Sequence, residues 1–585
     1  MTSKYQIIMS KQTFHLGLSM AGAVSAGAYT AGFMDYLLEA LSEWENAKQQ
    51  QLNNSDSNIP THNVIIDAIG GASAGGMVGM IATLALYAGN WKPVKKVSNV
   101  KTGNILYDSW VFLDDDENLY SEKASGKGTF EKMLDISDIN PEVGAPSLLN
   151  STPIDAIAER VFNELPKEAG LDNFPQYISK DLRLLITLTS LRPLDYKVKM
   201  SRIKSKFLDE TPSHRVSSHD VLAHFKLNFD DTKDKNHYLP FHPHNLDSRQ
   251  FLIKVTKATG AFPIGLKSRY FDNEFTTSYL NNSLKVRKSL IKDLDILIDA
   301  EQTPNFQFTA IDGGTINNEP FDEVLRHLVK KHGEPNLDNP KFGTVHIDPF
   351  PNFFDAKVTD DVNHKVSSIV GILGAIVPTI LSQARYKQTD TYGVGLFKLM
   401  SFPRKLKSGK MEIREHPPLA TGALEGFGGF LDIKFRQHDF FLGRDNARNF
   451  LRGILFLECD KHNPNNLFYG VSDAAIAEFK RNVKQKDGSE KIYMPIIPDI
   501  SKIEGDSNPT KYEVEDFPKF NGKAFRELKK PIKKRVNAIL KAELKGRVKS
   551  WWLKPIIAAF RGVIASKITN WVIEQVELDF KNRKM

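Results

Sequence analysis

Residues 64–86 read VIIDAIGGASAGGMVGMIATLAL, and this stretch decides how the chain folds. Its first six residues are rich in β-branched side chains and predict a buried strand. The apolar run from Met77 to Leu86 predicts a buried helix. Glycines interrupt the pattern between the two and leave a lone serine, Ser73, at the turn. We therefore expect Ser73 on a sharp strand-to-helix turn.

The residues around this serine, Gly71 to Gly75, read GASAG and match the G-x-S-x-G nucleophile elbow. Small side chains let the chain turn tightly and let a substrate approach the Ser73 hydroxyl. The N-terminus of the following helix adds a positive partial charge where an oxyanion would form. A small-residue turn without chemistry is the alternative. Strand, turn and helix all fall where the motif requires them, so we favour a nucleophile.

Strands and helices alternate along the first part of the chain. Residues 14–19 predict a strand, and a small-residue loop and a helix over residues 29–41 follow it. Further strands are predicted at residues 182–188, 306–311 and 344–347. This order is typical of an α/β fold with a parallel sheet and helices on its faces.

The chain has 585 residues, of which 41% are hydrophobic and 25% charged, as in an ordinary globular protein of two or more domains. We predict one domain over residues 1–395, with insertions at about 91–150 and 197–250. A mainly helical C-terminal extension would cover residues 396–585. The second insertion holds six of the fifteen histidines. They lack the spacing of a metal site, so we predict solvated loop histidines and no metal.

Nothing in the sequence indicates export or a membrane span. Cys459 is the single cysteine, which excludes a disulfide within the chain, and no secretory signal follows Met1. The longest apolar run, residues 366–384, contains Pro378, glycines and serines, so a kinked buried helix is favoured over a membrane span. We expect a cytoplasmic protein.

Positive charge is concentrated at the C-terminal end. Residues 521–585 carry 17 Lys and Arg against 5 Asp and Glu, whereas the whole chain has a net charge of +8. Basic residues alternate there with tryptophans and other apolar residues, a composition suited to peripheral contact with an anionic membrane. Amphipathic helices packed on the rest of the protein are an equal alternative. No nucleic-acid-binding motif accompanies the charge, so no nucleic acid partner is predicted.

A serine hydroxyl needs a base to accept its proton. Asp312 ends a predicted strand, and Gly313 and Gly314 after it free the loop to bring the carboxylate beside a neighbouring turn. A triad would require a histidine later in the chain. Candidate histidines exist after Asp312, none of them in a recognisable motif: His327, His332 and His346. A Ser73–Asp312 dyad is the simpler arrangement.

Four blocks in this order resemble the patatin-like phospholipases. They are the loop at residues 18–27, the elbow at residues 71–75, ATGAFP at residues 258–263, and DGGTINNEP at residues 312–320. The resemblance covers roughly residues 14–350. It implies a patatin-like α/β core and a Ser-Asp dyad that cleaves acyl esters of phospholipids or related lipids through an acyl-enzyme, without a metal or cofactor. Residues 430–451 are similar to C-terminal extensions of large bacterial members.

The loop block departs from the family's G-G-G-x-R-G pattern. It reads GAVSAG, from Gly22 to Gly27, and lacks two glycines and the basic residue. Oxyanion holes use backbone N–H groups, which alanine and valine also have. We therefore expect the oxyanion hole to be formed by the N–H groups of four residues: Gly22, Ala23, Val24 and Ala74. Ser25 is taken as an ordinary loop residue.

Two other functions remain open. One is a soluble esterase with a histidine-containing triad, which replacement of the histidines after Asp312 would reveal. The other is a catalytically inactive, membrane-associated scaffold, for which the altered loop is the only support.

Overall fold

The computed structural model describes most of the chain. The described residues are 12–51, 57–121, 125–199, 213–289, 294–336, 338–350, 398–401, 405–407, 410–412, 418–503, 517–545 and 553–585. The helix expected at residues 366–384 lies outside them. Within the described residues, no helix is both long enough and apolar enough to cross a bilayer.

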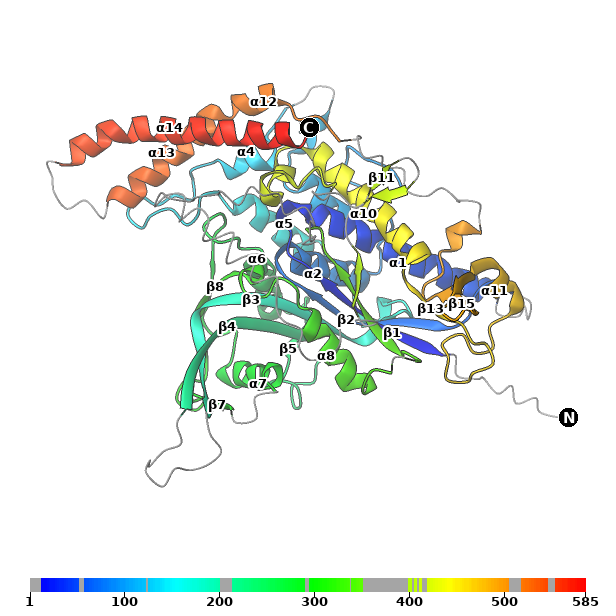
Figure 1. The fold of residues 1–585 in the computed structure, drawn as a ribbon. Helices are drawn as coiled ribbons and strands as arrows, with labels where there is room; N and C mark the ends of the chain where they lie inside the picture. The colour runs from blue at the N-terminus through cyan, green and yellow to red at the C-terminus, as the bar shows by residue number, and fades with distance from the viewer. Residues whose placement is uncertain are drawn as a thin grey trace.

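A mostly parallel sheet forms the centre of the molecule, with strand order β10-β9-β1-β2-β3-β4-β5 (Figure 1). Its strands are β1 (Thr13–Met20), β2 (Asn63–Gly71), β3 (Ile178–Lys199), β4 (Ser213–Lys226), β5 (Leu239–Pro240), β9 (Phe342–Ile347) and β10 (Lys398–Ser401). Strand β1 pairs in parallel with β2 and β9, and β2 pairs in parallel with β3. Three strands join antiparallel: β6 (Arg269–Phe271), β7 (Leu294–Ile296) and β8 (Phe308–Asp312).

Helices cover both faces of this sheet. Val324 of α8 (Phe321–His332) lies over Gly17 and Gly70 on one face, and α2 (Ser73–Ala88) lies on the other face, over Ile69. The remaining helices of this part are α1 (Gly27–Gln50), α3 (Ile105–Tyr107), α4 (Thr129–Met133), α5 (Thr152–Asn163), α6 (Leu246–Thr259) and α7 (Thr277–Arg287). The predicted α/β fold is confirmed.

The polar region at 197–250 differs from its expected form, because β4 is a full strand of the sheet and pairs antiparallel with β3. Val221, Ala223 and Phe225 of this strand are buried in the core, and Leu222 between them is also buried. His219 and His224 also lie on β4, so these two are strand residues and not solvated loop histidines.

The C-terminal part is mainly helical, as predicted. It contains the short 3₁₀ helices η6 (Ala423–Gly426) and η7 (Gly428–Phe430), and the helices α10 (Ile433–Gly453), α11 (Asp473–Phe479), α12 (Gly522–Glu527), α13 (Lys529–Lys545) and α14 (Leu553–Asn582). A small antiparallel sheet of β13 (Phe456–Glu458), β14 (Arg481–Lys484) and β15 (Glu490–Pro495) follows α10. Helices α13 and α14 project as a hairpin from one end of the molecule (Figure 1).

Helix α10 packs directly along α1. A Cβ at Gly443 would lie 2.1 Å from the carbonyl oxygen of Tyr29, so the two backbones almost touch. Arg444 forms buried ion pairs with Asp35 and Glu39 of α1. The division into domains at residue 395 stays a prediction, but α1 and α10 share one hydrophobic core.

Candidate active site

Ser73 lies on a strained turn at the carboxyl end of β2. It is the first residue of α2, and its φ of 50° is in the left-handed region that residues with a Cβ rarely adopt. A Cβ at Gly75 would lie 2.4 Å from the carbonyl oxygen of Met20, which explains why glycine follows the serine two residues later. This is the geometry of a nucleophile elbow.

The Ser73 hydroxyl donates a hydrogen bond of 2.5 Å to Oδ2 of Asp312. The other carboxylate oxygen, Oδ1, accepts the N–H of Gly314 at 2.7 Å. A Cβ at Gly313 would lie 2.1 Å from the carbonyl oxygen of Thr187, so only glycine lets the chain pass β3 this closely. The structure thus brings the two predicted catalytic residues together and fixes the carboxylate on both sides.

Burial raises the pKa of Asp312 from its ordinary value to about 7, although the hydrogen bonds from Ser73 and Gly314 lower it. The desolvation of the charged carboxylate outweighs the two neutral donors. A carboxyl group with this pKa exchanges a proton readily near neutral pH, as a general base must.

The block at residues 258–263 connects the two halves of the site. The Thr259 hydroxyl accepts the backbone N–H of Ser73 at 3.0 Å, and the carbonyl oxygen of Ala261 accepts the N–H of Asp312 at 2.9 Å. Sequence reasoning singled out this block by resemblance but did not assign roles to Thr259 or Ala261. Thr259 and Ser73 are 186 residues apart in the chain. No local sequence pattern predicts a contact over such a distance.

The predicted oxyanion loop lies against the nucleophile. A Cβ at Gly22 would lie 2.8 Å from the Cβ of Ser73, and Val24 and Ala74 line the same pocket as Ser73. The N–H of Gly22 points to the carbonyl oxygen of Asn318 at 3.4 Å. The N–H groups of Ala23, Val24 and Ala74 are therefore better candidates than that of Gly22 for binding an oxyanion.

Above the Ser73 hydroxyl lies a narrow apolar pocket of about 40 Å³. Its walls are almost entirely hydrophobic: Met77, Ile81, Trp110, Leu113, Ile154, Ile157, Phe262, Leu266 and Phe430. Such a lining favours a hydrocarbon chain over a polar substrate. Ligand pockets typically measure ~300–1,000 Å³, so this one must widen to admit a long chain.

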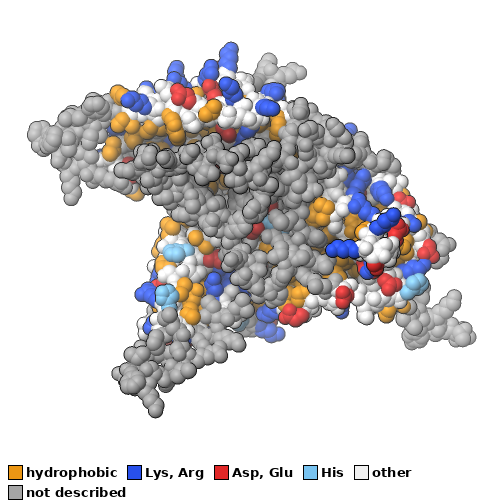
Figure 2. Space-filling view, in the orientation of Figure 1, with side chains coloured by type: hydrophobic (Ala, Val, Ile, Leu, Met, Phe, Trp, Pro, Cys, Tyr) orange, Lys and Arg blue, Asp and Glu red, His pale blue; other side chains and the backbone are white. Residues whose placement is uncertain are grey.

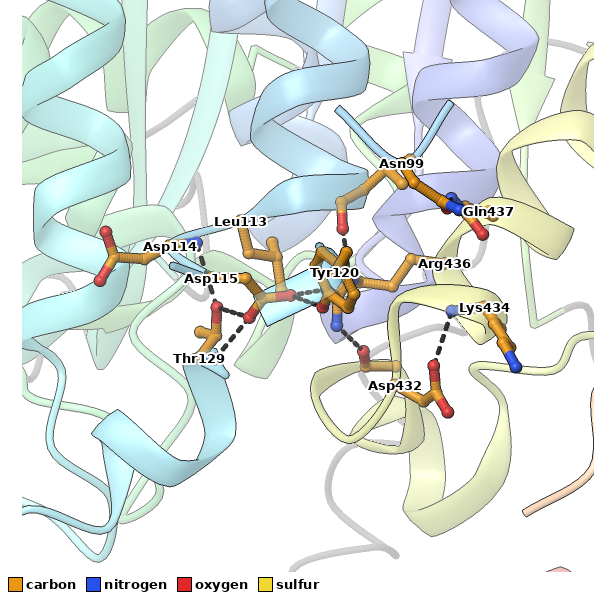
Figure 3. A network of polar contacts seen from close by, with 12 residues as sticks. Asn99, Leu113, Asp114, Asp115, Tyr120, Thr129, Asp432, Lys434, Arg436 and Gln437 are labelled. Carbon is orange, nitrogen blue, oxygen red and sulfur yellow. Dashed lines mark hydrogen bonds and ion pairs between the residues drawn. The ribbon is translucent and has the colours of Figure 1, made fainter. Parts of the chain in front are cut away.

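Arg436 of α10 holds one wall of this pocket in place. Its guanidinium pairs with the buried Asp115, in the network of polar contacts shown in Figure 3, and donates to the carbonyl oxygens of Val111, at 2.5 Å, and of Gly429, at 2.7 Å. Leu113, which lines the pocket, lies between Val111 and Asp115. Residues of the C-terminal part thus help to shape the site, which the sequence did not predict.

The histidines proposed for a triad lie elsewhere in the structure. In the described part of the chain, no histidine forms a hydrogen bond with Ser73 or Asp312. His332 bonds to Asp67 at 2.7 Å, and His346 lies between Ser19 and Glu319, at 3.2 Å and 3.3 Å. His327 packs against His224.

Two groups of described residues have donor atoms close enough to hold a metal ion: His15, Asp67 and His332, and Glu319, His346 and Asp348. In the first group, Lys331 already contacts Asp67 at 2.7 Å. Burial would raise the pKa of Asp67, but hydrogen bonds from its basic neighbours hold the pKa well below its usual range. Neither group includes Ser73 or Asp312.

The fold and the site together define an α/β protein with a serine elbow and a buried aspartate at the carboxyl edge of its sheet. The profile of the family described as "Patatin-like phospholipase" matches residues 18–325, more than half of the chain. The chain therefore belongs to the patatin-like phospholipases, a family of lipid acyl hydrolases.

Two individual proteins are also similar. "Uncharacterized protein y4iI" of Sinorhizobium fredii is 27% identical over 573 residues, which cover 91% of this chain and 76% of that protein. The crystal structure of VipD from Legionella pneumophila is 11% identical, with 96% of this chain and 91% of that chain covered. Its TM-score of 0.23 is too low to carry a structural argument.

Proposed function

We propose that this protein is a serine hydrolase that cleaves acyl esters of phospholipids or related lipids. One observation carries the proposal: the Ser73 hydroxyl donates to the Asp312 carboxylate at 2.5 Å, at the base of an apolar pocket. The family membership supports lipid as the substrate class.

Each group has a defined role in the proposed reaction. Asp312 accepts the proton of Ser73 as its Oγ attacks the ester carbonyl, and backbone N–H groups of the oxyanion loop and Ala74 stabilise the negative oxygen. Protonated Asp312 then gives its proton to the leaving alcohol, and an acyl-enzyme remains on Ser73. Asp312 next takes a proton from water, which attacks the acyl-enzyme, and then returns this proton to the Ser73 Oγ as the acyl–oxygen bond breaks and the fatty acid is released. No step requires a metal or cofactor.

The test is Ser73→Ala combined with labelling by a fluorophosphonate. The variant should lose hydrolysis of a water-soluble ester by at least roughly 10³-fold and should no longer be labelled. It should keep its thermal stability, because the elbow is already built of alanine and glycine. Activity of the folded variant above a trace would exclude Ser73 as the nucleophile.

The triad alternative is tested by His346→Asn and His332→Asn. Both histidines contact other groups in the structure, so neither change should lower the turnover of a water-soluble ester beyond any loss of stability. A loss as complete as that of Ser73→Ala in a folded His346 variant would favour the triad. Absence of labelling and of hydrolysis in the wild type would favour the scaffold.

We further propose that α13 and α14 bind an anionic lipid surface. Helix α14 has two apolar faces. One packs inward and includes Ala565, Ile573, Val576 and Phe580, whereas the opposite face exposes Ile564, Ile568, Trp571 and Leu578 to solvent. Trp571 is 60% exposed. A second, exposed apolar face is suited to burial among lipids.

The charges on the hairpin support a lipid surface as its partner. Figure 2 shows hydrophobic side chains in a row along the hairpin, with Lys and Arg side chains above them. Four lysines near the start of α13 are exposed: Lys529, Lys530, Lys533 and Lys534. Arg535 differs from them, because it is buried and bonds to both carboxylate oxygens of Asp138, at 2.8 Å and 3.0 Å. Arg535 is structural and does not contribute to the proposed lipid surface.

A further inference from the structure

Ser25 links the oxyanion loop to a segment 400 residues later in the chain. Its hydroxyl donates to the carbonyl oxygen of Gly426 and accepts the N–H of Gly429 at 3.0 Å. The side chain is buried, so these two bonds are not shared with bulk water. Both glycines belong to η6 and η7, the short helices just before α10.

The segment fits closely against the residues that would bind the oxyanion. A Cβ at Gly426 would lie 3.0 Å from the carbonyl oxygen of Ala23 and 3.3 Å from the Cβ of Val24. Val24 has a φ of 49°, a conformation that is unfavourable for a β-branched residue and persists only when its surroundings impose it. Ser25, the next residue, supplies the hydrogen bonds that can impose it.

The segment itself is fixed from three directions. Asp439 of α10 accepts the N–H groups of Ala420 and Thr421, at 2.8 Å and 2.9 Å. Asp579 of α14 accepts the N–H of Leu424 at 2.7 Å. Arg436 donates to the carbonyl oxygen of Gly429, as described above. The segment is therefore a rigid support and not a free loop.

We propose that Ser25 is a positioning residue, through which residues 420–430 hold the Ala23 and Val24 N–H groups in the orientation that stabilises the oxyanion. This inference rests on the proposed hydrolase function. It gives a physical reason why a loop that lacks the inner glycines of its family can still form an oxyanion hole: support from the C-terminal part replaces the intrinsic freedom of glycine.

The test is Ser25→Ala in the full-length protein, with a water-soluble ester as substrate. We expect kcat to fall roughly 10- to 100-fold, less than the ~10²–10³-fold loss of a direct oxyanion donor, while KM changes less than twofold. The pH midpoint of activity should stay the same, because the contacts of Asp312 are untouched. Ser25→Cys, which keeps a weak donor of similar shape, should lie between alanine and the wild type.

A second measurement separates transition-state geometry from ground-state binding. An alkyl trifluoromethyl ketone forms a tetrahedral oxyanion adduct with a nucleophilic serine, whereas the matched alkyl alcohol cannot. The inhibition constant of the ketone should rise in Ser25→Ala by the same factor as kcat falls. Binding of the alcohol should not change.

Ser190→Ala is the matched control. The buried Ser190 hydroxyl likewise donates to a carbonyl oxygen and accepts an N–H, both of Arg192, but it links residues only two apart. This control should keep wild-type kcat. An equal loss of kcat in the control, or a folded Ser25→Ala variant with kcat within twofold of the wild type, would overturn the role of Ser25. Loss of activity in Ser73→Ala would still uphold the hydrolase assignment in that case.

Discussion

Asp312 accepts its two hydrogen bonds from neutral groups, the Ser73 hydroxyl and the Gly314 N–H, so burial dominates its titration. Its pKa of about 7 in the folded protein lies above the ordinary value of 3.8. The ionised form is the one that accepts the serine proton. We therefore expect kcat/KM for a water-soluble ester to rise with pH to a plateau, with a midpoint near 7, which a pH profile checks.

The raised pKa of Asp312 also makes the stability of the protein depend on pH. Between pH 4 and 7 the folded state holds a proton on Asp312 that the unfolded state has lost, so this group's contribution to stability falls as pH rises through 7. Asp312→Asn removes the titration. We subtract the unfolding free energy of the wild type from that of the variant. This difference should be larger at pH 8 than at pH 5 by a few kcal/mol, since one pKa unit is about 1.4 kcal/mol.

Denaturant unfolding at the two pH values measures this difference, and activity should be lost at both. A stability difference between variant and wild type that is independent of pH would show that the Asp312 pKa is not raised.

At the residue scale, the sequence predicted what depends on local pattern. Ser73 follows the end of one strand and Asp312 ends another, each with glycines beside it, and these signals lie within a few residues. Thr259 and Ser25 carry no such signal, because their partners are far away in the chain and a single hydroxyl can serve many roles. The sequence gives Ser25 no role beyond that of a loop residue, although its hydroxyl contacts residues about 400 positions away.

At the scale of elements, the contact of α1 with α10 depends on glycine. Gly443→Ala would place a methyl group 2.1 Å from the Tyr29 carbonyl oxygen. The helices would have to separate, at a cost of about 1–3 kcal/mol for overpacking. Thermal or denaturant unfolding should show a clear loss of stability.

Gly453→Ala on the same helix is the control, because a Cβ there meets no atom within 4 Å. It should leave stability unchanged or raise it by up to about 1 kcal/mol. If the two substitutions have equal effects, the helices do not approach as closely as the structure indicates.

The burial of helix α10 could not be predicted from its sequence. Its sequence is rich in Arg, Asp and Asn, which suggests an exposed helix, yet Arg436 and Arg444 are buried. Their charges are compensated by Asp115, Asp35 and Glu39, which lie hundreds of residues earlier. The pattern of hydrophobic residues in a sequence cannot predict that a charged residue is buried in an ion pair. Strand β4 was not predicted, because its first residues, from Ser213 to Asp220, are mostly polar and only a short apolar run, from Val221 to Ala223, follows them.

At the scale of the whole molecule, the proposed lipid surface predicts where charge matters. Reversal of the four exposed lysines of α13 to glutamate, with Arg535 kept, should weaken binding to vesicles that contain anionic lipid roughly 100-fold or more, since each basic residue contributes about 1 kcal/mol. Binding of the wild type should also fall as salt rises. Hydrolysis of a water-soluble ester should stay unchanged. Vesicle sedimentation and ester turnover measure the two effects.

The control reverses four exposed lysines elsewhere, and changes net charge by the same amount: Lys235, Lys480, Lys484 and Lys486. It should bind vesicles nearly as well as the wild type. Trp571→Ala should weaken binding even at high salt, because it removes an apolar contact. Full vesicle affinity in the α13 variant would show that the hairpin is only a structural element.

The oxyanion loop is supported by η6, η7 and α14, which are synthesised after both proposed catalytic residues. Ser73 and Asp312 leave the ribosome long before Asp579, which fixes Leu424. At ~5–20 residues per second, the intervening chain takes roughly 13–53 s to make. A nascent chain would thus carry both reacting side chains without the support for its oxyanion loop. We therefore expect an unfinished chain to hydrolyse esters more slowly than the complete one, because the support for its oxyanion loop is synthesised last.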